Sequence, residues 1–162
     1  MRFLSGEEEK KALEYIVKSA NIALKSRCGR SRCGSVIVKQ DEIIGIGFNS
    51  PPGYLESQER CEYSKKDYNQ KVTDKTCCIH AEQRAIIDAL RKNPNKIFDS
   101  RLYFIRLDDK GLPSRAGKPY CTICSKMALD VGIGEFVLWH EQGICVYDTE
   151  EYNNLSFNFN DN

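Results

Sequence analysis

His80-Ala81-Glu82, followed 41 residues after the histidine by Cys121-Thr122-Ile123-Cys124, is the stretch that decides how this chain folds and what chemistry to expect from it. The two motifs supply one imidazole and two thiolates that can bind zinc, and a carboxylate two residues from the imidazole. Zinc takes four ligands, and catalytic sites keep one of these positions for water. Three protein ligands and one free glutamate therefore indicate a hydrolase that activates water on a metal.

Each motif has a simpler interpretation when it is taken alone. A lone CxxC is often half of a structural zinc site or a redox pair, and a lone HxE occurs by chance. Glu82 separates a catalytic zinc site from a structural one, because a structural site has no use for the carboxylate. We therefore predict that His80, Cys121 and Cys124 bind a catalytic zinc ion and that Glu82 is not one of its ligands. A zinc module without catalysis is the alternative.

Length and composition indicate a folded chain with little net charge. Of the 162 residues, 41% are hydrophobic and 29% are charged. This length suits a single domain, residues 1–162, with a sizeable core, and the composition is not that of a disordered chain. The net charge of +1 argues against general affinity for nucleic acids, which usually needs a basic face. A local basic groove is still compatible with it.

The cysteines and the first residues indicate the compartment. Eight cysteines without an apolar leader segment argue for a reducing compartment, so we expect a cytoplasmic protein. Met1 to Lys10 are too charged to act as a secretion signal, and no apolar run approaches the length of a membrane span. We therefore expect no membrane partner. At these spacings, cysteines of a cytoplasmic protein indicate metal binding before disulfides.

A helix and a hairpin are expected before the first motif. Apolar residues recur at three- and four-residue steps from Glu7 to Lys25, which predicts an amphipathic helix. Ser5 is its expected N-cap, with Glu8 completing a capping box. Two apolar runs, Val36 to Val38 and Ile43 to Phe48, are separated by four polar residues and predict two antiparallel strands.

Two further features lie between the first helix and the first motif. Gly45 and Gly47 in the second strand predict a bulge or the close approach of another backbone. Asn49 to Cys78 is a polar segment that is long for a loop, so it is functional or contains local structure.

Helices and strands alternate after residue 78. Helices are expected from Ile79 to Lys92 and from Cys121 to Val131, and strands from Leu102 to Leu107 and from Phe136 to Trp139. Asp108 to Lys118 is a polar insertion before the second motif.

The last residues, 141–162, are weakly patterned, with a candidate edge strand from Ile144 to Tyr147. The order is α-β-β-α-β-α-β, and the strands are nearly continuous apolar runs, as expected when both faces of a sheet are covered. This predicts a three-layer α/β/α sandwich with a mixed central sheet.

At these residues the chain resembles the cytidine/deoxycytidylate deaminase superfamily, and within it the deoxycytidylate (dCMP) deaminase group. The H-x-E…P-C-x-x-C signature is that of zinc nucleobase deaminases. The resemblance rests on three segments: Cys33 to Val38, Gly45 to Gly53 and Ile79 to Ile86. The second of these segments resembles the G-Y-N-G-x-P-x-G loop of dCMP deaminases.

The resemblance implies hydrolytic deamination of the cytosine of a free nucleotide, with dCMP converted to dUMP. In that role Glu82 takes a proton from water and returns protons to the ring nitrogen and the leaving amine. The backbone N–H of Ala81 binds the base carbonyl, and Asn49 contacts the sugar; ordinary turn chemistry is the alternative for Asn49. Family members are usually oligomers, so a homo-oligomer is expected.

The alternative function is deamination of cytosine or adenine in single-stranded DNA or RNA. It needs a basic channel lined by aromatic residues, and Tyr54, Tyr63, Tyr68 and Tyr120 are candidates for stacking on bases. The nearly neutral charge gives this function little support.

Three departures from the family pattern are expected to border the substrate pocket. Tyr120 stands between Pro119 and the first cysteine of the second motif, Arg84 replaces an asparagine, and the insertion from Asp108 to Lys118 lengthens the gap between the motifs. They bear on the substrate and leave the reaction class unchanged. Tyr120 is therefore included among the substrate-binding candidates.

The resemblance also implies a second, structural zinc in some dCMP deaminases, with ligands where Cys28, Cys61 and Cys78 stand. Cys77 or Cys33 could complete a tetrahedral set. The alternative for each is a small buried apolar residue. Cys145 matches no pattern.

Two smaller features leave alternatives open. The basic cluster of Lys25, Arg27, Arg30 and Arg32 is either a solvated connector or a phosphate site, which neighbouring glycines would suit. His140 is expected at the surface and not as a metal ligand.

Overall fold

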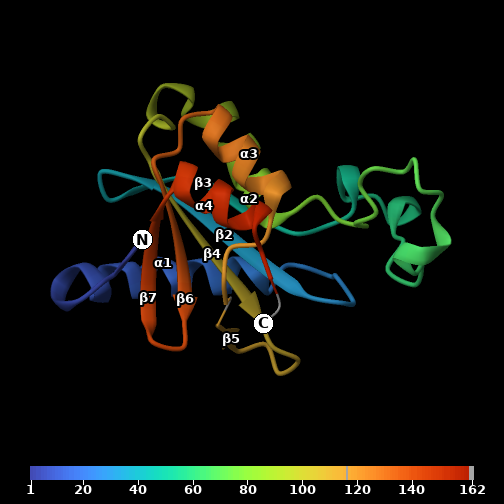
Figure 1. Cartoon of the computed structure of the whole chain (residues 1–162), viewed down its shortest axis with the longest axis horizontal. Helices are drawn as coiled ribbons and strands as arrows, with labels where there is room; N and C mark the ends of the chain where they lie inside the picture. The colour runs from blue at the N-terminus through green and yellow to red at the C-terminus, as the bar shows by residue number, and fades with distance from the viewer. Residues whose placement is uncertain (116, 161–162) are drawn as a thin grey trace.

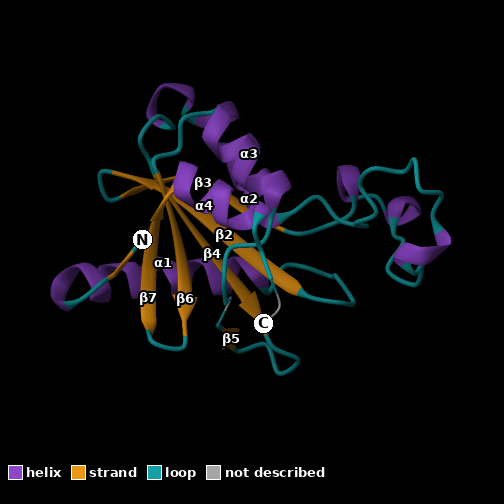
Figure 2. Cartoon of the chain, in the orientation of Figure 1, coloured by secondary structure: helices purple, strands orange, loops and turns teal. Residues whose placement is uncertain are grey.

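One mixed sheet organises the chain, and helices cover both of its faces (Figures 1 and 2). The computed structural model describes residues 1–115 and 117–160. The strands are β1 (Arg2–Phe3), β2 (Arg32–Lys39), β3 (Glu42–Phe48), β4 (Arg101–Leu107), β5 (Pro113–Ser114), β6 (Glu135–His140) and β7 (Gly143–Asp148). Their order is β1-β7-β6-β4-β2-β3, and β5 pairs with β4 at the side. β4 and β6 run parallel, whereas the other pairs are antiparallel. The predicted three-layer α/β/α sandwich with a mixed sheet is confirmed.

Four α-helices divide between the two faces (Figure 1). They are α1 (Gly6–Ala23), α2 (Ala81–Lys92), α3 (Thr122–Asp130) and α4 (Thr149–Phe157). α1 packs on one face, and α2, α3 and α4 pack on the other, each side with its own hydrophobic core. β2 contributes to both cores because its side chains alternate. Val36 and Val38 belong to the α1 core, and Ile37 belongs to the α2 core.

The hairpin of β2 and β3 holds α2 in place. Glycines bring β3 so close to α2 that a side chain does not fit between them. A Cβ at Gly47 would lie 2.2 Å from the carbonyl oxygen of Ala81, and one at Gly45 would lie 2.5 Å from that of Ala85. The strand register also shifts between Ile37 and Val38, so the bulge and the close backbone approach both occur. The first turn of α2 is therefore fixed against the sheet.

Two details of the N-terminal half differ from the prediction. β2 begins at Arg32 and not at Val36, because the earlier residues also pair with β4. Ser5 precedes α1, but its side chain makes no capping bond. The expected capping box is wrong because the Glu8 carboxylate accepts hydrogen bonds from Arg2 at 2.7 and 2.8 Å and from Arg101 at 3.1 Å.

The C-terminal segment is more ordered than its sequence pattern indicated. β7 lies between β6 and β1, so the candidate edge strand is an inner strand. α4 follows, with the Asp148 side chain accepting hydrogen bonds from the backbone N–H groups of Glu150 and Glu151. The sequence pattern of this segment is weak because α4 buries few side chains. Residues 161–162 of this segment lie outside the described residues.

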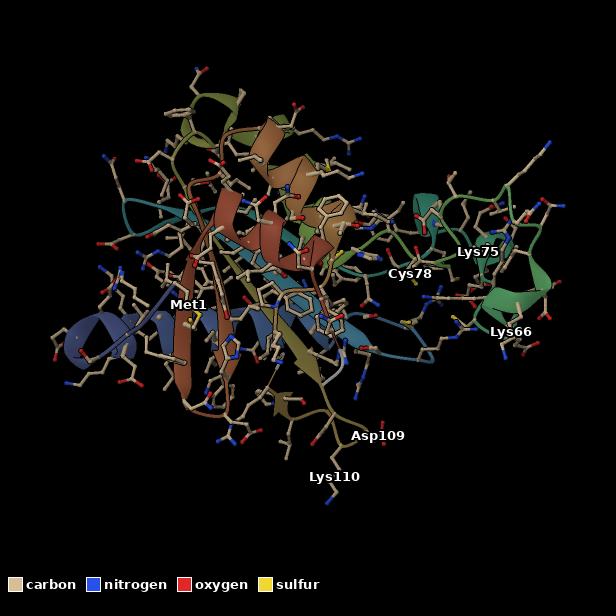
Figure 3. All side chains as sticks on the ribbon, viewed as in Figure 1. Met1, Lys66, Lys75, Cys78, Asp109 and Lys110 are labelled. Atoms are coloured by element: carbon tan, nitrogen blue, oxygen red, sulfur yellow. The ribbon has the colours of Figure 1, made fainter. Side chains whose placement is uncertain are left out.

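The polar insertion after β4 folds back on that strand through β5. The Asp108 carboxylate closes the turn by accepting from the backbone N–H groups of Lys110 and Leu112. Asp109 and Lys110 lie at the tip of this turn (Figure 3). Residue 116 of the insertion lies outside the described residues.

The long polar segment projects from the side of the sandwich (Figure 1). Its ends are pinned together by two backbone hydrogen bonds between Ser50 and Ile79, at 2.9 and 3.3 Å. Lys66 and Lys75 lie on the projecting part, and Cys78 lies where the chain rejoins the sandwich (Figure 3). It contains the short 3-10 helices η1 (Pro52–Tyr54), η2 (Glu56–Gln58) and η3 (Lys65–Asp67), and a fourth, η4 (Pro94–Lys96), follows α2. The local structure expected for it is therefore present.

Within the described residues, we find no helix that has both the length and the hydrophobicity needed to cross a membrane.

Candidate metal and substrate site

The first turns of two helices bring the two motifs together. His80 is the residue before α2, and Glu82 lies in the first turn of that helix. Cys121 is the residue before α3, and Cys124 lies in its first turn. The positive end of a helix dipole stabilises anionic groups such as thiolates and carboxylates. The fold thus places all four side chains where both helices favour negative charge.

The three predicted ligands are arranged to hold a metal ion. Nδ1 of His80 lies 3.2 Å from Sγ of Cys121 and 3.2 Å from Sγ of Cys124. All three ligand atoms lie within 4.8 Å of one another. Zinc bonds of about 2.1 Å to nitrogen and 2.3 Å to sulfur, at a tetrahedral angle, separate the two atoms by about 3.5 Å. The observed spacing and the nitrogen-sulfur donor set both fit zinc.

Burial and hydrogen bonds set the charges of the site. Hydrogen bonds with Cys124 and then with His80 lower the pKa of Cys121 to about 4, which keeps it as the thiolate that binds metals. Glu82 is 4% exposed. Its burial, and then the charge of Cys121, raise the pKa of its carboxyl to about 7. A carboxyl group with such a pKa can both accept and donate a proton near neutral pH.

A cavity of about 280 Å³ opens beside these residues, and the predicted substrate-binding residues line it: Asn49, Ala81 and Tyr120. Ala81 is the first residue of α2, where a backbone N–H has no partner within the helix. Asn49 is buried, and both ends of its amide already bind backbone. Its Oδ1 accepts from the N–H of Cys33 at 2.8 Å, and its Nδ2 donates to the carbonyl of Ser31 at 2.7 Å. The amide therefore shapes the pocket wall and keeps capacity for one more bond at each end.

The sheet contributes pocket residues that were not predicted as substrate residues, namely Cys33, Phe104 and Arg106. Cys33 of β2 and Arg106 of β4 are directly paired across the sheet. The Arg106 guanidinium donates to the Tyr120 hydroxyl at 2.8 Å. A signal was available, because Arg106 interrupts the apolar run of its strand.

Comparison with known proteins identifies the family. The description "Cytidine and deoxycytidylate deaminase zinc-binding region" matches residues 7–140. The chain belongs to this family. It is 27% identical over 125 residues to a deoxycytidylate deaminase of Saccharomyces cerevisiae, covering 76% of the chain and 36% of that protein. It is 32% identical over 84 residues to the deoxycytidylate deaminase of Schizosaccharomyces pombe, covering 48% of the chain and 26% of that protein. The matches thus span about a third and a quarter of these two relatives.

Solved structures of the family share the fold of this chain. The dCMP deaminase of the cyanophage S-TIM5, in complex with dCMP and dUMP, has a TM-score of 0.56 and is 22% identical, with 82% of each chain covered. The cytidine deaminase of Burkholderia pseudomallei has a TM-score of 0.55 and is 16% identical, with 86% of this chain and 94% of that chain covered. At these identities the similarity is one of fold.

Two of the three family departures lie away from the pocket of this deaminase-family chain. The Arg84 guanidinium stacks on the Tyr54 ring, 3.9 Å from its centroid, and donates to the carbonyl of Pro51 at 2.8 Å. It lines a separate cavity against β3. None of the described residues from Asp108 to Lys118 lines the substrate pocket, although β5 of the insertion pairs with Arg106 and Leu107 at the end of β4. Tyr120 alone borders the pocket as expected.

A cluster of four thiols, Cys28, Cys61, Cys77 and Cys78, lies at the mouth of the same pocket, where the projecting segment joins the sandwich. Cys28, Cys61 and Cys78 lie close enough to influence the pKa values of one another's thiols, and the sulfur atoms of Cys61 and Cys77 are 3.9 Å apart. We call the set of His80, Cys121 and Cys124 the first centre. The sulfur atoms of the thiol cluster are less closely grouped than the ligand atoms of the first centre. Among the described residues, the His80 set is the one group whose ligand atoms all lie within 4.8 Å.

Two arginines of the predicted basic cluster hold the projecting segment, which neither earlier interpretation anticipated. Arg30 donates to the carbonyl of Cys61 at 2.9 Å and to that of Tyr63. Arg27 pairs with Glu56 at 3.2 Å.

Four other side chains are placed by packing. Tyr63 and Tyr68 pair with each other on the projecting segment, with ring centroids 6.1 Å apart, so of the four candidate tyrosines only Tyr120 lines the pocket. Cys145 is fully buried in the α2 core. His140, expected at the surface, is half-buried because its Nε2 bonds the Tyr147 hydroxyl at 2.7 Å.

Proposed function

We propose that residues 1–162 form a single zinc-dependent hydrolytic deaminase domain that converts the cytosine of a free nucleotide to uracil, with dCMP to dUMP as its reaction. The observation that carries the proposal is the buried Glu82 carboxylate, which lines the pocket beside a His80–Cys121–Cys124 set spaced for zinc. A structural zinc site would leave this carboxylate without a role. The proposal agrees with membership of the zinc-binding deaminase family.

Glu82 moves the protons in this reaction. When bound, zinc lowers the pKa of a water molecule to about 7, which provides a nucleophile at neutral pH. Glu82 accepts a proton from the attacking water and delivers protons to the ring nitrogen N3 and to the leaving amine. A bond forms between C4 and oxygen, the bond between C4 and the amino nitrogen breaks, and ammonia leaves. Water is the only co-reactant.

The pocket wall orients the base and the sugar. The backbone N–H of Ala81, unpaired at the start of α2, donates to the carbonyl of the base. Asn49 is held by Cys33 and Ser31 and directs its remaining hydrogen-bonding capacity at the sugar. Tyr120, held by Arg106, forms the opposite wall. These groups align C4 with the attacking water and exclude other geometries.

A mononucleotide suits the charge of this chain better than a polynucleotide. The net charge is +1, whereas each phosphate contact of a polynucleotide binder needs a basic side chain and makes affinity fall steeply with salt. Both curated relatives are named as deoxycytidylate deaminases. The cyanophage neighbour was solved with dCMP and dUMP.

The direct test is a substrate panel. The zinc-loaded protein is incubated with cytidine, dCMP, dCTP and a single-stranded oligonucleotide containing cytosine, and uracil products are quantified. We expect dCMP to be the fastest substrate and the oligonucleotide to bind weakly at physiological salt. Glu82→Gln protein is the control for contaminating deaminases. Efficient conversion of the oligonucleotide, with the mononucleotides untouched, would replace this function by polynucleotide deamination.

We further propose that Cys28, Cys61, Cys77 and Cys78 bind a second, structural zinc. Four thiols converge at the base of a segment whose residues 52–77 include no fully buried side chain. A metal that closes a long loop removes conformational entropy from the unfolded chain. Elemental analysis of fresh protein purified without chelators should give two zinc ions per chain. One zinc per chain would contradict the proposal.

We also propose that the protein is cytoplasmic and self-associates. Ile46 of β3, an edge strand, and Ile87 of α2 are exposed and line one shared cavity. Light scattering should give a mass of at least two chains, and a monomer at micromolar concentration would contradict self-association.

A further inference from the structure

Arg106 is a half-buried cation in the substrate pocket with unused hydrogen-bonding capacity. Its guanidinium donates to the Tyr120 hydroxyl at 2.8 Å. Its Nε is buried and has no hydrogen-bond partner among the residues that the structure describes. A buried polar group without a partner is unfavourable, and more so when it is charged. The pocket therefore contains a donor that a bound ligand can satisfy.

The groups that surround Arg106 leave its positive charge uncompensated. Its polar neighbours are the Tyr120 hydroxyl and the Cys33 thiol, and neither is a carboxylate. Glu82 is the carboxylate of the same pocket, and within the described residues it forms no ion pair with Arg106. Burial raises the pKa of the Cys33 thiol to about 11, so this neighbour is neutral at physiological pH. In the described part of the chain, Arg106 forms no ion pair with Asp or Glu within 4.0 Å. A cation in this setting favours an anionic ligand.

The other cations of the pocket differ from Arg106. Arg30 is bound to the carbonyls of Cys61 and Tyr63 on the projecting segment. Lys65 is an exposed residue of η3. Arg106, in contrast, extends from a central strand, β4, which fixes its backbone, and Tyr120 holds one arm of its guanidinium. Of these three cations, Arg106 is the one held in place with a free donor.

The chemistry of a nucleotide identifies the group that such a cation would bind. The cytosine base and the sugar are neutral at pH 7, and the phosphate is anionic. The planar fork of an arginine matches phosphate oxygens and can bind two of them at once. We propose that Arg106 is a specificity-determining residue that binds the phosphate of the nucleotide substrate. This inference rests on the proposed function, because it names the part of that substrate which Arg106 selects.

The test compares a substrate that carries the phosphate with one that lacks it. The ratio of kcat/KM for dCMP to kcat/KM for deoxycytidine is measured for the wild type, Arg106→Gln and Arg106→Lys. Arg106→Gln should lower this ratio by about 10- to 100-fold, the usual effect of losing a hydrogen bond to a charged group. Arg106→Lys keeps the charge and loses the fork, so its ratio should lie between the other two. Deoxycytidine turnover shows that each variant is folded and loaded with metal.

Arg115→Gln is the matched control, because Arg115 pairs with Glu141 outside the pocket and its loss should leave the ratio unchanged. An equal loss of activity toward both substrates in Arg106→Gln would overturn the inference, since Arg106 would then act on the base, the sugar or the fold. An unchanged ratio would overturn it as well.

Calorimetric titration with dUMP and with deoxyuridine gives a second readout that does not need turnover. Arg106→Gln should weaken the binding of dUMP by about 10- to 100-fold more than it weakens the binding of deoxyuridine, because deoxyuridine reports only the change in the wall formed by Tyr120. If the wild type deaminates no cytosine compound but binds dUMP more tightly than Arg106→Gln does, the proposed function is wrong and the inference that Arg106 binds the phosphate still holds. Equal affinity of wild type and Arg106→Gln for dUMP would end the role of Arg106 alone.

Discussion

The His80–Cys121–Cys124 centre and the thiol cluster border the same pocket, yet they are built in different ways. Every ligand of the first centre sits at the start of a helix that packs on the sheet, and β3 approaches one of these helices without any intervening side chain. In the thiol cluster, Cys61 and Cys77 come from the projecting segment, which contains only short 3-10 helices. The scaffold therefore determines the geometry of the first centre, whereas the geometry of the thiol cluster depends on the contacts that hold the projecting segment.

This difference explains why the first centre suits catalysis and the second suits structure. A catalytic group must be held near its productive position before the substrate arrives. The first turns of α2 and α3 provide this, because their backbones are fixed by the core. The projecting segment of the thiol cluster is held by Arg27 and Arg30, and the metal proposed for the cluster would add to this order.

The largest expected effect is that of removing a ligand of the first centre. Cys121→Ser should lose the zinc of that centre and reduce deamination to the level of the uncatalysed reaction. Structural zinc sites bind with about 10–16 kcal/mol of apparent free energy, so thermal stability should also fall. Zinc content and melting temperature are measured together with activity. A Cys121→Ser protein with full zinc and full activity would rule out the first centre as described.

Removal of the carboxylate should separate chemistry from metal binding. Glu82→Gln is expected to lower kcat by about 10²- to 10⁴-fold, the usual contribution of general acid–base catalysis, and to keep the zinc content of the wild type. Activity within a few-fold of wild type would show that Glu82 is not the proton carrier. Loss of zinc would show instead that it is a ligand.

A single methyl group tests whether the scaffold fixes the first centre. In Gly47→Ala the new Cβ would lie 2.2 Å from the carbonyl oxygen of Ala81, so the start of α2 must move. We expect a loss of about 1–3 kcal/mol in the free energy of unfolding and lower activity. Gly29→Ala is the control beside the thiol cluster, where the nearest atom to a new Cβ is 4.0 Å away. It should change stability by less than about 0.5 kcal/mol. Equal effects of the two variants would contradict the comparison.

The smallest effect on activity is expected from the thiol cluster. Cys61→Ser should reduce the zinc content from two ions per chain to one and speed hydrogen exchange in residues 52–77, while deamination stays within a few-fold of wild type. Cys145→Ala removes a thiol from the core and should leave the zinc content unchanged. Loss of activity in Cys61→Ser while zinc still fills the first centre would contradict the comparison. It would show that catalysis at the first centre depends on the thiol cluster.

Local motifs were sufficient to predict that His80, Cys121 and Cys124 come together in an arrangement that can hold a metal ion, because these residues belong to short patterns at helix starts. The layers of the fold followed from apolar periodicity. The sequence was less informative where a role depends on distant partners. Arg106 acquires its environment from Cys33 and Tyr120, on other elements, and β7 is an inner strand only because the two residues of β1 pair with it. Arg84 lies away from the pocket because its guanidinium stacks on Tyr54 and bonds the carbonyl of Pro51. Its place two residues after Glu82 in the sequence does not reveal these contacts.

The paired backbone hydrogen bonds between Ser50 and Ile79 have a consequence for comparing this chain with its relatives. Because the bridge closes the base of the projecting segment just before His80, the number of residues beyond it can change without moving the histidine. Insertions and deletions are tolerated best at such exposed, self-contained positions. An alignment gap in this family therefore belongs between residues 52 and 77, and the same stretch is the natural place to graft or shorten a loop when the substrate range is redesigned.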